Sequence, residues 1–271
     1  MIYTVSLITF GLFLSVLSED EEQNKPEEQS DNASKSRPNI LFISVDDLND
    51  WVGCLGGHPQ AKTPNIDALA GRGVLFEHAY CAAPLCSPSR TAVMTGLSPS
   101  TTGIYGNLNW FRDLPKYKDW VTLPRYFRKH GYKAFGGGKL FHQPKGKFSD
   151  PSSWDEQYSL GQGTPRPEPS RRYTHGLKEK FSNPILARLI DWEPLEKPKE
   201  QSADWRTAAG AAEFLKRKHE KPFFLGCGIY LPHLPWHVPK KYFDIHPLDK
   251  IQLPQHLTND IDDVPPGGRR M

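Results

Sequence analysis

Short, nearly continuous hydrophobic runs alternate along the chain with segments in which apolar residues recur every three or four positions. Strands buried on both faces, as in a parallel sheet, are predicted for four runs: 39–45, 74–80, 132–135 and 222–229. A Ser or Thr opens three of the predicted helices: from Thr63 to Gly71 or Gly73, from Thr122 to His130, and from Ser202 to about His219. This alternation predicts an α/β fold with a mostly parallel or mixed sheet sandwiched by helices.

The first 36 residues divide into an uncharged apolar stretch and an acidic one. Residues 2–17 form an apolar run shorter than the about 20 residues that a membrane span needs, and small residues precede a cleavage point after Ser18. We therefore expect a signal peptide over 1–18, a periplasmic or secreted protein, and no stable membrane span; the lack of Lys or Arg leaves a signal anchor open. Residues 19–36 hold seven acids and two lysines, which predicts a disordered acidic linker before a folded body over 37–271.

Composition limits the partners of this body. The chain of 271 residues is 37% hydrophobic and 24% charged, which suits a globular protein, and its four cysteines exclude a disulfide-dense scaffold. Because the whole chain has a net charge of +3 and the acidic linker carries −5, the body carries +8. This charge is too small to indicate a nucleic-acid partner. It either favours an anionic substrate or reflects ordinary surface lysines.

Two predicted strands end in residues that suit chemistry, which in α/β sheets gathers at the carboxyl ends of strands. Asp46 and Asp47 follow the first strand directly, and the last strand is followed by a loop with His233 and His237. Adjacent carboxylates repel each other, and a hard divalent cation such as Ca²⁺, which takes oxygen ligands, would resolve this conflict. A solvated turn or a helix cap explains the same acidic pair equally well.

A further segment places a cysteine at the start of a predicted helix. Pro88 suits the first turn, which puts Cys86 just before the positive end of the helix and Arg90 one turn further on. A cysteine in this setting is electrostatically primed, whereas a buried structural cysteine is the plain alternative. The other cysteines lack such a setting: Cys54, Cys81 and Cys227.

This segment resembles the signature of type I sulfatases, which reads Cys-x-Pro-Ser-Arg and, after four further residues, Thr-Gly. Here it runs from Cys86 to Arg90 and then to Thr95 and Gly96. The resemblance implies an alkaline-phosphatase-like sulfatase fold, in which a formylglycine-generating enzyme oxidises the cysteine to Cα-formylglycine (3-oxoalanine). Cys86 is then the precursor of the nucleophile, and it needs no histidine partner of the cysteine-protease kind.

Other segments resemble the same family. The opening strand with Asp46 and Asp47 is similar to the strand whose aspartates bind calcium in sulfatases, and 63–70 resembles the family's first helix. Lys139 and His142 match the pair that flanks the sulfate, with the spacing of iduronate-2-sulfatase-like members. The loop after the last strand resembles the loop that carries a substrate-facing histidine. That role is assigned to His233, with His237 as the alternative.

The resemblance also implies a mechanism. Three positions would hold one calcium ion: Asp46, Asp47 and the modified Cys86. Arg90 would hold the hydrated aldehyde, while Lys139 and His233 would clamp the sulfate oxygens as charge develops. One hydroxyl of the hydrate would attack sulfur and expel the alcohol. His142 would then deprotonate the second hydroxyl, or orient the hydrate, as sulfate leaves.

The resemblance covers nearly all of residues 37–271, but sulfatases of this type are usually much longer. Nothing after His237 matches the further metal-binding pair or the second lysine of the family, and Asp262 and Asp263 follow no apolar strand. We therefore expect the N-terminal portion of a sulfatase domain, with an exposed sheet edge, which is inactive or poorly folded by itself.

Several functions remain open at this stage. A sulfated sugar or glycan is the expected substrate by analogy with iduronate-2-sulfatase-like enzymes. Choline sulfate or an aryl sulfate are alternatives within the same reaction. A phosphonate or phosphodiester hydrolase is a second enzyme class with the same aldehyde and fold. An inactive remnant that binds sulfated polysaccharide is the non-enzymatic alternative.

Overall fold

The computed structural model describes residues 37–158, 190–196 and 199–268, so the predicted signal peptide and acidic linker lie outside the described residues. The described α-helices are α1 (Pro64–Ala70), α2 (Cys86–Thr95), α3 (Pro99–Thr102), α4 (Leu123–Lys129), α6 (Ala203–Lys216) and α7 (Lys241–Asp244). The described strands are β1 (Ile40–Val45), β2 (Lys133–Gly138), β3 (Glu156–Gln157), β4 (Trp192–Leu195), β5 (Phe223–Ile229) and β6 (Trp236–Pro239). Short 3₁₀ turns connect several of these elements.

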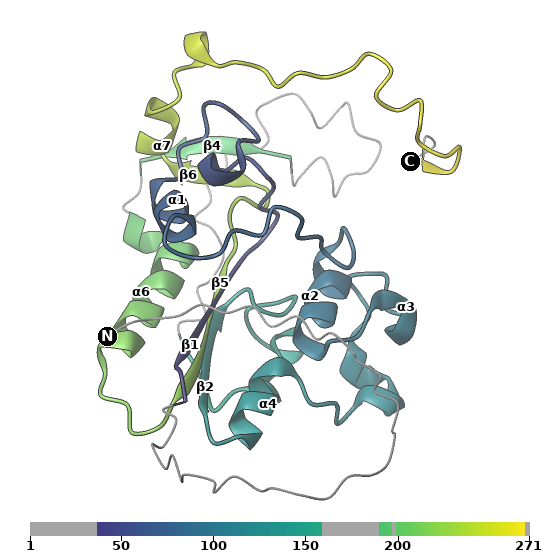
Figure 1. Ribbon diagram of the computed structural model, residues 1–271, viewed down its shortest axis with the longest axis vertical. Helices are drawn as coiled ribbons and strands as arrows, with labels where there is room; N and C mark the ends of the chain where they lie inside the picture. The colour runs from purple at the N-terminus through teal and green to yellow at the C-terminus, as the bar shows by residue number, and fades with distance from the viewer. Residues whose placement is uncertain (1–36, 159–189, 197–198, 269–271) are drawn as a thin grey trace, which may run out of the picture.

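The described strands form two sheets in which every pairing is parallel. The larger sheet has the order β1-β5-β2-β3, and β4 pairs with β6 in a small second sheet. Because β1, β5 and β2 run in the same direction, their carboxyl ends lie together at one end of the larger sheet (Figure 1). The predicted α/β fold with a mostly parallel sheet is confirmed.

Helices cover both faces of the larger sheet, with α6 on one face and α2 and α4 on the other (Figure 1). Alternate residues of β5 point to opposite faces, as the strand period requires. Phe223 and Leu225 pack with Phe214 of α6, while Phe224 belongs to the cluster that contains Met94 of α2. Burial on both faces explains why this strand reads as a continuous apolar run.

Most predicted elements are present, with small differences at their ends. β2 extends beyond the predicted strand 132–135 as far as Gly138, and α6 ends at Lys216, before the predicted end near His219. The extra length of β2 is built from consecutive glycines, which carry no apolar pattern to predict a strand. They pair with β5 through backbone groups alone.

One predicted strand is wrong. Residues 74–80 have no regular secondary structure, and Val74 and Tyr80 expose 76% and 87% of their surface. A strand needs a neighbour that pairs with its backbone groups, and no described strand pairs with this segment. The apolar pattern therefore does not show whether another strand is available to pair with the backbone of this segment.

β1 forms one edge of the larger sheet, and the two-residue strand β3 forms the other. Within the described ranges, no strand pairs with the outer side of β1, and Ile43 is 52% exposed. The neighbouring helix α1 also leaves Ile66 and Leu69 partly exposed. In the described residues, no helix is both long enough and apolar enough to cross a bilayer.

Candidate active site

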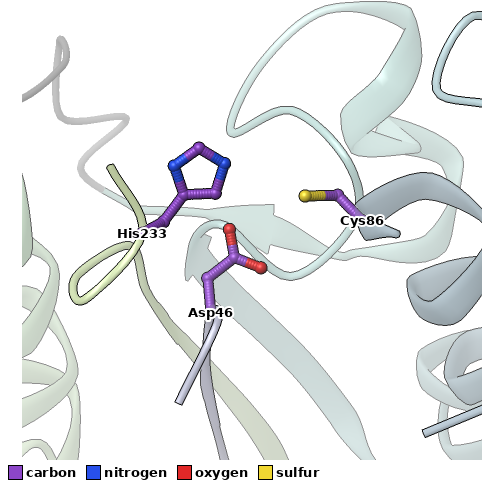
Figure 2. A group of neighbouring side chains, drawn as sticks. All are labelled: Asp46, Cys86 and His233. Atoms are coloured by element: carbon purple, nitrogen blue, oxygen red, sulfur yellow. The ribbon is translucent and has the colours of Figure 1, made fainter. Parts of the chain in front are cut away.

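A polar cluster lies where the carboxyl ends of β1, β2 and β5 meet the N-terminus of α2 (Figure 1). Asp46 follows β1, Lys139 follows β2, His233 lies in the loop after β5, and Cys86 is the first residue of α2. Figure 2 shows the side chains of Asp46, Cys86 and His233 directed toward a common space. One ligand atom from each of these three lies within 4.8 Å of the other two. The fold thus gathers residues from distant parts of the sequence.

A buried carboxylate pairs with two buried cations at the base of the cluster. Asp46, Lys139 and Arg90 are only 5%, 6% and 8% exposed. Asp46 Oδ1 accepts a bond from Arg90 Nη2 at 2.5 Å, and its Oδ2 forms an ion pair with Lys139 Nζ. Burial alone would raise the pKa of Asp46, but the two cations outweigh it and lower that pKa. The ionised carboxylate leaves one net positive charge among the three groups.

Arg90 holds the ends of β1 and β2 against α2. Besides bonding Asp46, its Nη1 donates to Ser44 Oγ at 3.3 Å and to the backbone carbonyls of Lys139 and Leu140. Its Nε is buried and has no hydrogen-bond partner in the described chain. The sequence placed Arg90 beside a hydrated aldehyde, and the structure adds a positioning role through backbone atoms, which no residue pattern reveals.

Cys86 is the first residue of α2, whereas the sequence placed it just before the helix. Its sulfur lies 3.6 Å from Lys139 Nζ. Hydrogen bonds from His142 and His233, together with the charge of Lys139, lower the pKa of Cys86 to about 6 against the opposing effect of burial. The positive end of α2 acts in the same direction. Negative charge is therefore stabilised at position 86.

The start of α2 is fixed by the loop that follows α3. The Ser87 N–H, which has no partner inside the helix, donates to Asn107 Oδ1 at 2.9 Å. Ser87 Oγ donates to the carbonyl of Asn109 at 3.3 Å. Sequence reasoning missed both asparagines, because side-chain capping from a distant loop leaves no local pattern.

Two glycines let β2 and β5 approach closely enough to place Lys139. Gly138 has a φ of +76°, and a Cβ there would lie 2.0 Å from the carbonyl oxygen of Gly228. A Cβ on Gly228 would lie 2.3 Å from the carbonyl carbon of Lys139. In the native backbone, the Lys139 N–H instead donates to the Gly228 carbonyl at 2.9 Å. The backbone of the buried lysine is thus held by a contact that only glycine permits.

The loop that carries His233 is held by a carboxylate of α6. Asp204 accepts bonds from the backbone N–H groups of Tyr230 and Leu231 at 2.7 and 2.9 Å. Lys139 Nζ then lies 4.7 Å from the centroid of the Tyr230 ring, and that ring lies 4.6 Å from the His233 ring. Sequence reasoning missed Asp204 and Tyr230. Asp204 gave no signal, because an acidic residue in the first turn of a helix is already explained by its favourable interaction with the helix dipole.

Asp47 and His142 lie at the margin of the cluster. Asp47 adopts a left-handed backbone with a φ of 56°, and its side chain is 55% exposed, with Oδ2 3.9 Å from His233 Nε2. The His142 ring packs edge-on against Phe148, and its Nδ1 is buried without a hydrogen-bond partner in the described chain. Since Asp47 lies beside His233 and His142 interacts with the Cys86 side chain, the structure brings both predicted residues to the site.

His237, the alternative to His233, lies elsewhere. It is buried in β6, where its Nε2 is 3.0 Å from Asp191 Oδ2. This pair joins β6 to the residue that precedes β4. The structure places His233 in the cluster, whereas His237 holds the small sheet together.

The donor atoms of the cluster fit a hard cation in part. Asp46 and Asp47 offer carboxylate oxygens, which suit Ca²⁺, whereas the Cys86 sulfur is a soft ligand. An oxygen at position 86, as formylglycine provides, would remove this mismatch. Ca²⁺ takes roughly six to eight oxygen ligands, so these three positions supply only part of a shell.

Comparisons with known proteins agree with this geometry. The sulfatase family profile matches residues 38–258. The chain is 38% identical over 244 residues to a sulfatase of Formosa agariphila, a match that covers 87% of this chain and 47% of that protein. It is 31% identical over 234 residues to iduronate 2-sulfatase of Homo sapiens, covering 82% and 40%. The chain thus spans less than half the length of these relatives.

A solved structure gives the same result for the fold. The crystal structure of Ps i-CgsB in complex with k-i-k-neocarrahexaose matches with a TM-score of 0.56 and 27% identity, covering 80% of this chain and 50% of that chain. The profile match contains the whole cluster, from Asp46 to His233. By fold, by profile and by the residues that converge at the carboxyl end of the larger sheet, this chain belongs to the sulfatase family.

Proposed function

We propose that the protein to which this chain belongs hydrolyses organic sulfate esters, with position 86 supplying the nucleophile as formylglycine. The observation that carries this proposal is the position of Cys86, at the positive end of α2 and 3.6 Å from the buried ammonium group of Lys139. Water and the ester R–O–SO₃⁻ give the alcohol and hydrogen sulfate, so one S–O bond is broken and one is formed. An unmodified thiol has no second hydroxyl with which to release the sulfate.

Each residue of the cluster has a distinct task in this proposal. Lys139 and His233 flank position 86 and donate to the sulfate oxygens, which carry the charge that develops in the transition state. Tyr230 and Asp204 keep these two donors in place. His142, which interacts with the Cys86 side chain, is placed to remove a proton at position 86.

Calcium is part of the proposal. Asp46 and Asp47 would hold the ion with an oxygen of the modified residue 86, and the ion would supply positive charge that polarises the sulfate. Asp46 is already ionised by its two cationic partners, so it offers a carboxylate ligand at neutral pH. The charges of Arg90 and Lys139 do not replace the ion, because the carboxylate that they share leaves only one net positive charge among the three groups.

Sulfated sugars are the proposed substrate class. Iduronate 2-sulfatase is among the relatives, and Ps i-CgsB was crystallised with an oligosaccharide. The Asp47 side chain at the margin of the cluster is 55% exposed, so it offers a polar group that can bond sugar hydroxyls.

We further propose that the protein is exported, because residues 2–17 form an uncharged apolar run followed by an acidic linker. Mature protein beginning at residue 19 would support export, and an intact N-terminus in the cytoplasm would contradict it.

Mass spectrometry of one tryptic peptide tests the nucleophile. The peptide 73–90 contains Cys86 and also Cys81, which serves as an internal reference. In protein purified from its own host, we expect a loss of about 18 Da at position 86, where an aldehyde replaces the thiol. After alkylation, the peptide should then carry one added group, on Cys81. If every molecule of the peptide carried two added groups, one on each cysteine, this result would contradict maturation.

Turnover of paired substrates tests the reaction. The matured protein should release sulfate from a sulfated disaccharide faster than it hydrolyses the matching phosphate ester, and Cys86→Ala should abolish both activities. A sulfated disaccharide, choline sulfate and an aryl sulfate, assayed together, rank the three substrate classes. Faster hydrolysis of a phosphonate than of any sulfate would overturn the proposal.

A further inference from the structure

A pocket of about 580 Å³ lies at the amino end of the larger sheet, opposite the cluster at its carboxyl end. It is bordered by the C-terminal end of α4, the turn into β2, and the segments before β3 and β5. The side chains that line it include one carboxylate, Asp155, and five cations: Arg125, Arg128, Lys129, Lys133 and Lys221. An excess of positive charge in a concave surface attracts anions.

The pocket is separate from the candidate active site. Lys133 is the first residue of β2, and Lys221 precedes the start of β5 by two residues, so both lie at the amino ends of their strands. Lys139, in contrast, follows the carboxyl end of β2. The length of β2 separates the two regions by roughly 20 Å, at about 3.3 Å per residue. The two ends of the sheet are visible in Figure 1, with α4 beside the amino ends.

The pocket holds more positive charge than its carboxylates neutralise. Arg128 Nε pairs with Asp155 Oδ1 at 2.8 Å, and Lys133 Nζ pairs with Glu156 Oε2 at 3.3 Å. Both pairs are partly or largely exposed, and such pairs exchange partners at little cost. In the described parts of the chain, no carboxylate forms an ion pair with the other three cations: Arg125, Lys129 and Lys221.

Helix stabilisation explains only part of this arrangement. Arg128 and Lys129 occupy the last turn of α4, where cations complement the negative end of the helix dipole. Arg125 lies in the first turn of the same helix, where a cation is unfavourable. Lys133 and Lys221 belong to the starts of strands and gain nothing from the dipole. A bound anion accounts for the grouping of all five.

We infer that this pocket binds sulfate groups of a polymeric sulfated glycan, at a distance from the ester that is hydrolysed. The class of ligand rests on the proposed function, which makes sulfated sugars the substrate. The guanidinium group of Arg125, whose Nη1 makes only a long bond of 3.5 Å to the Trp120 carbonyl, can donate two parallel bonds to an oxyanion. Arg128 is held by Asp155 and by the Ser152 carbonyl, so it contributes mainly its charge. The three lysines add point charges around it. A glycan chain held here stays near the cluster, which raises the effective concentration of its other sulfate esters.

Binding without turnover tests this inference. The probe is a fluorescein-labelled dextran sulfate oligosaccharide, with unsulfated dextran as its reference, and all proteins carry Cys86→Ala so that no ester is cleaved. One variant combines Arg125→Gln, Lys129→Gln and Lys221→Gln. Its control has the same loss of charge at exposed lysines outside the pocket: Lys116→Gln, Lys118→Gln and Lys241→Gln. Circular dichroism confirms that each protein is folded.

The pocket variant should bind dextran sulfate about tenfold more weakly than its parent, since three exposed charge contacts are lost. The control variant should bind like the parent. Equal weakening in both variants, or no binding by the parent, would overturn the inference. Equally tight binding of a short single-stranded DNA would overturn the assignment to a glycan. Because the assay needs no aldehyde and no turnover, these failures leave the proposed sulfatase reaction standing, and the peptide mass tests that reaction separately.

Discussion

Arginine and lysine side chains gather at both ends of the larger sheet, but they are buried and paired at one end and open to solvent at the other. At the carboxyl end, Arg90 and Lys139 are almost fully buried and share the carboxylate of Asp46. At the amino end, five cations surround an open pocket, and three of them have no carboxylate partner in the described residues. Burial is the difference between the two ends, because a charge removed from water must be paired, whereas an exposed charge is stabilised by solvent.

This difference in burial predicts where each kind of effect should appear. Removing one member of a buried network leaves the others unpaired and affects folding. Removing an exposed cation changes the attraction for anions but leaves the fold intact. The carboxyl end should therefore respond mainly in stability and reactivity, and the amino end mainly in binding.

The largest effect is expected for Asp46→Ala. This change leaves Arg90 and Lys139 buried without their shared carboxylate, and we expect the free energy of unfolding to fall by about 3–5 kcal/mol. Urea unfolding followed by circular dichroism measures it. Asp47→Ala is the matched control, because that side chain is 55% exposed, and it should cost less than about 1 kcal/mol. Equal losses at the two neighbours would contradict the comparison.

The reactivity of Cys86 should depend on pH in the unmodified protein. Its pKa of about 6 means that the thiolate predominates at pH 7, and the rate of alkylation should fall by half near pH 6 as the solution is acidified. In urea the midpoint should move up to about pH 8.5, the value of a free thiol. His142→Ala should raise the midpoint in the folded protein, because it removes the main cause of the lowered pKa. An unchanged midpoint in that variant would show that His233, Lys139 and the helix suffice to lower the pKa of Cys86.

Gly228→Ala tests the close approach of β2 and β5. The new methyl group would overlap the backbone at Lys139, so we expect a loss of about 1–3 kcal/mol in stability. We also expect slower alkylation of Cys86 at pH 7, since the lysine that faces its sulfur is displaced. Gly267→Ala is the control, because nothing lies within 4 Å of a Cβ there. Normal stability with Ala at 228 would show that the strands can separate without cost.

The smallest effect on folding is expected at the amino end. Replacing Arg125, Lys129 and Lys221 together by Gln should change the free energy of unfolding by less than about 0.5 kcal/mol at each site. At low ionic strength, relief of the mutual repulsion in the pocket stabilises the variant, the loss of the Lys129 charge at the negative end of α4 offsets part of this gain, and the net change should shrink in high salt. A loss above 3 kcal/mol would mean that these cations support the fold and would erase the contrast between the two ends.

The sequence predicted those parts of the fold in which one face or both faces of an element are buried. β1 and β5 read as apolar runs, and α6 has the helical period, so all three were predicted close to their actual ends. The predicted strand over 74–80 failed because no described strand pairs with the backbone of this segment. The glycine-rich end of β2 escaped prediction for the opposite reason. Its backbone is paired, but glycine has no side chain that could show an apolar pattern.

The site divides in a similar way. The structure brings together residues that had been identified from motifs on separate segments, among them Asp46, Cys86, Lys139 and His233. The residues that position them were not predicted. Asp204 bonds backbone N–H groups of a distant loop, and Asn107 caps α2 from outside the helix. Such contacts depend on tertiary distance alone, so no spacing in the sequence reveals them.

By itself, the sequence determined the alternation of strands and helices, the membership of the sulfatase family and the chemical types of the residues at the site, because periodicity and local motifs are written in consecutive positions. The packing of the chain determines that Arg90 connects two strand ends to α2 and that His233, not His237, faces Cys86. The structure alone also showed that scattered cations gather in one pocket. These outcomes depend on burial and on distances between remote segments, which exist only once the chain has packed.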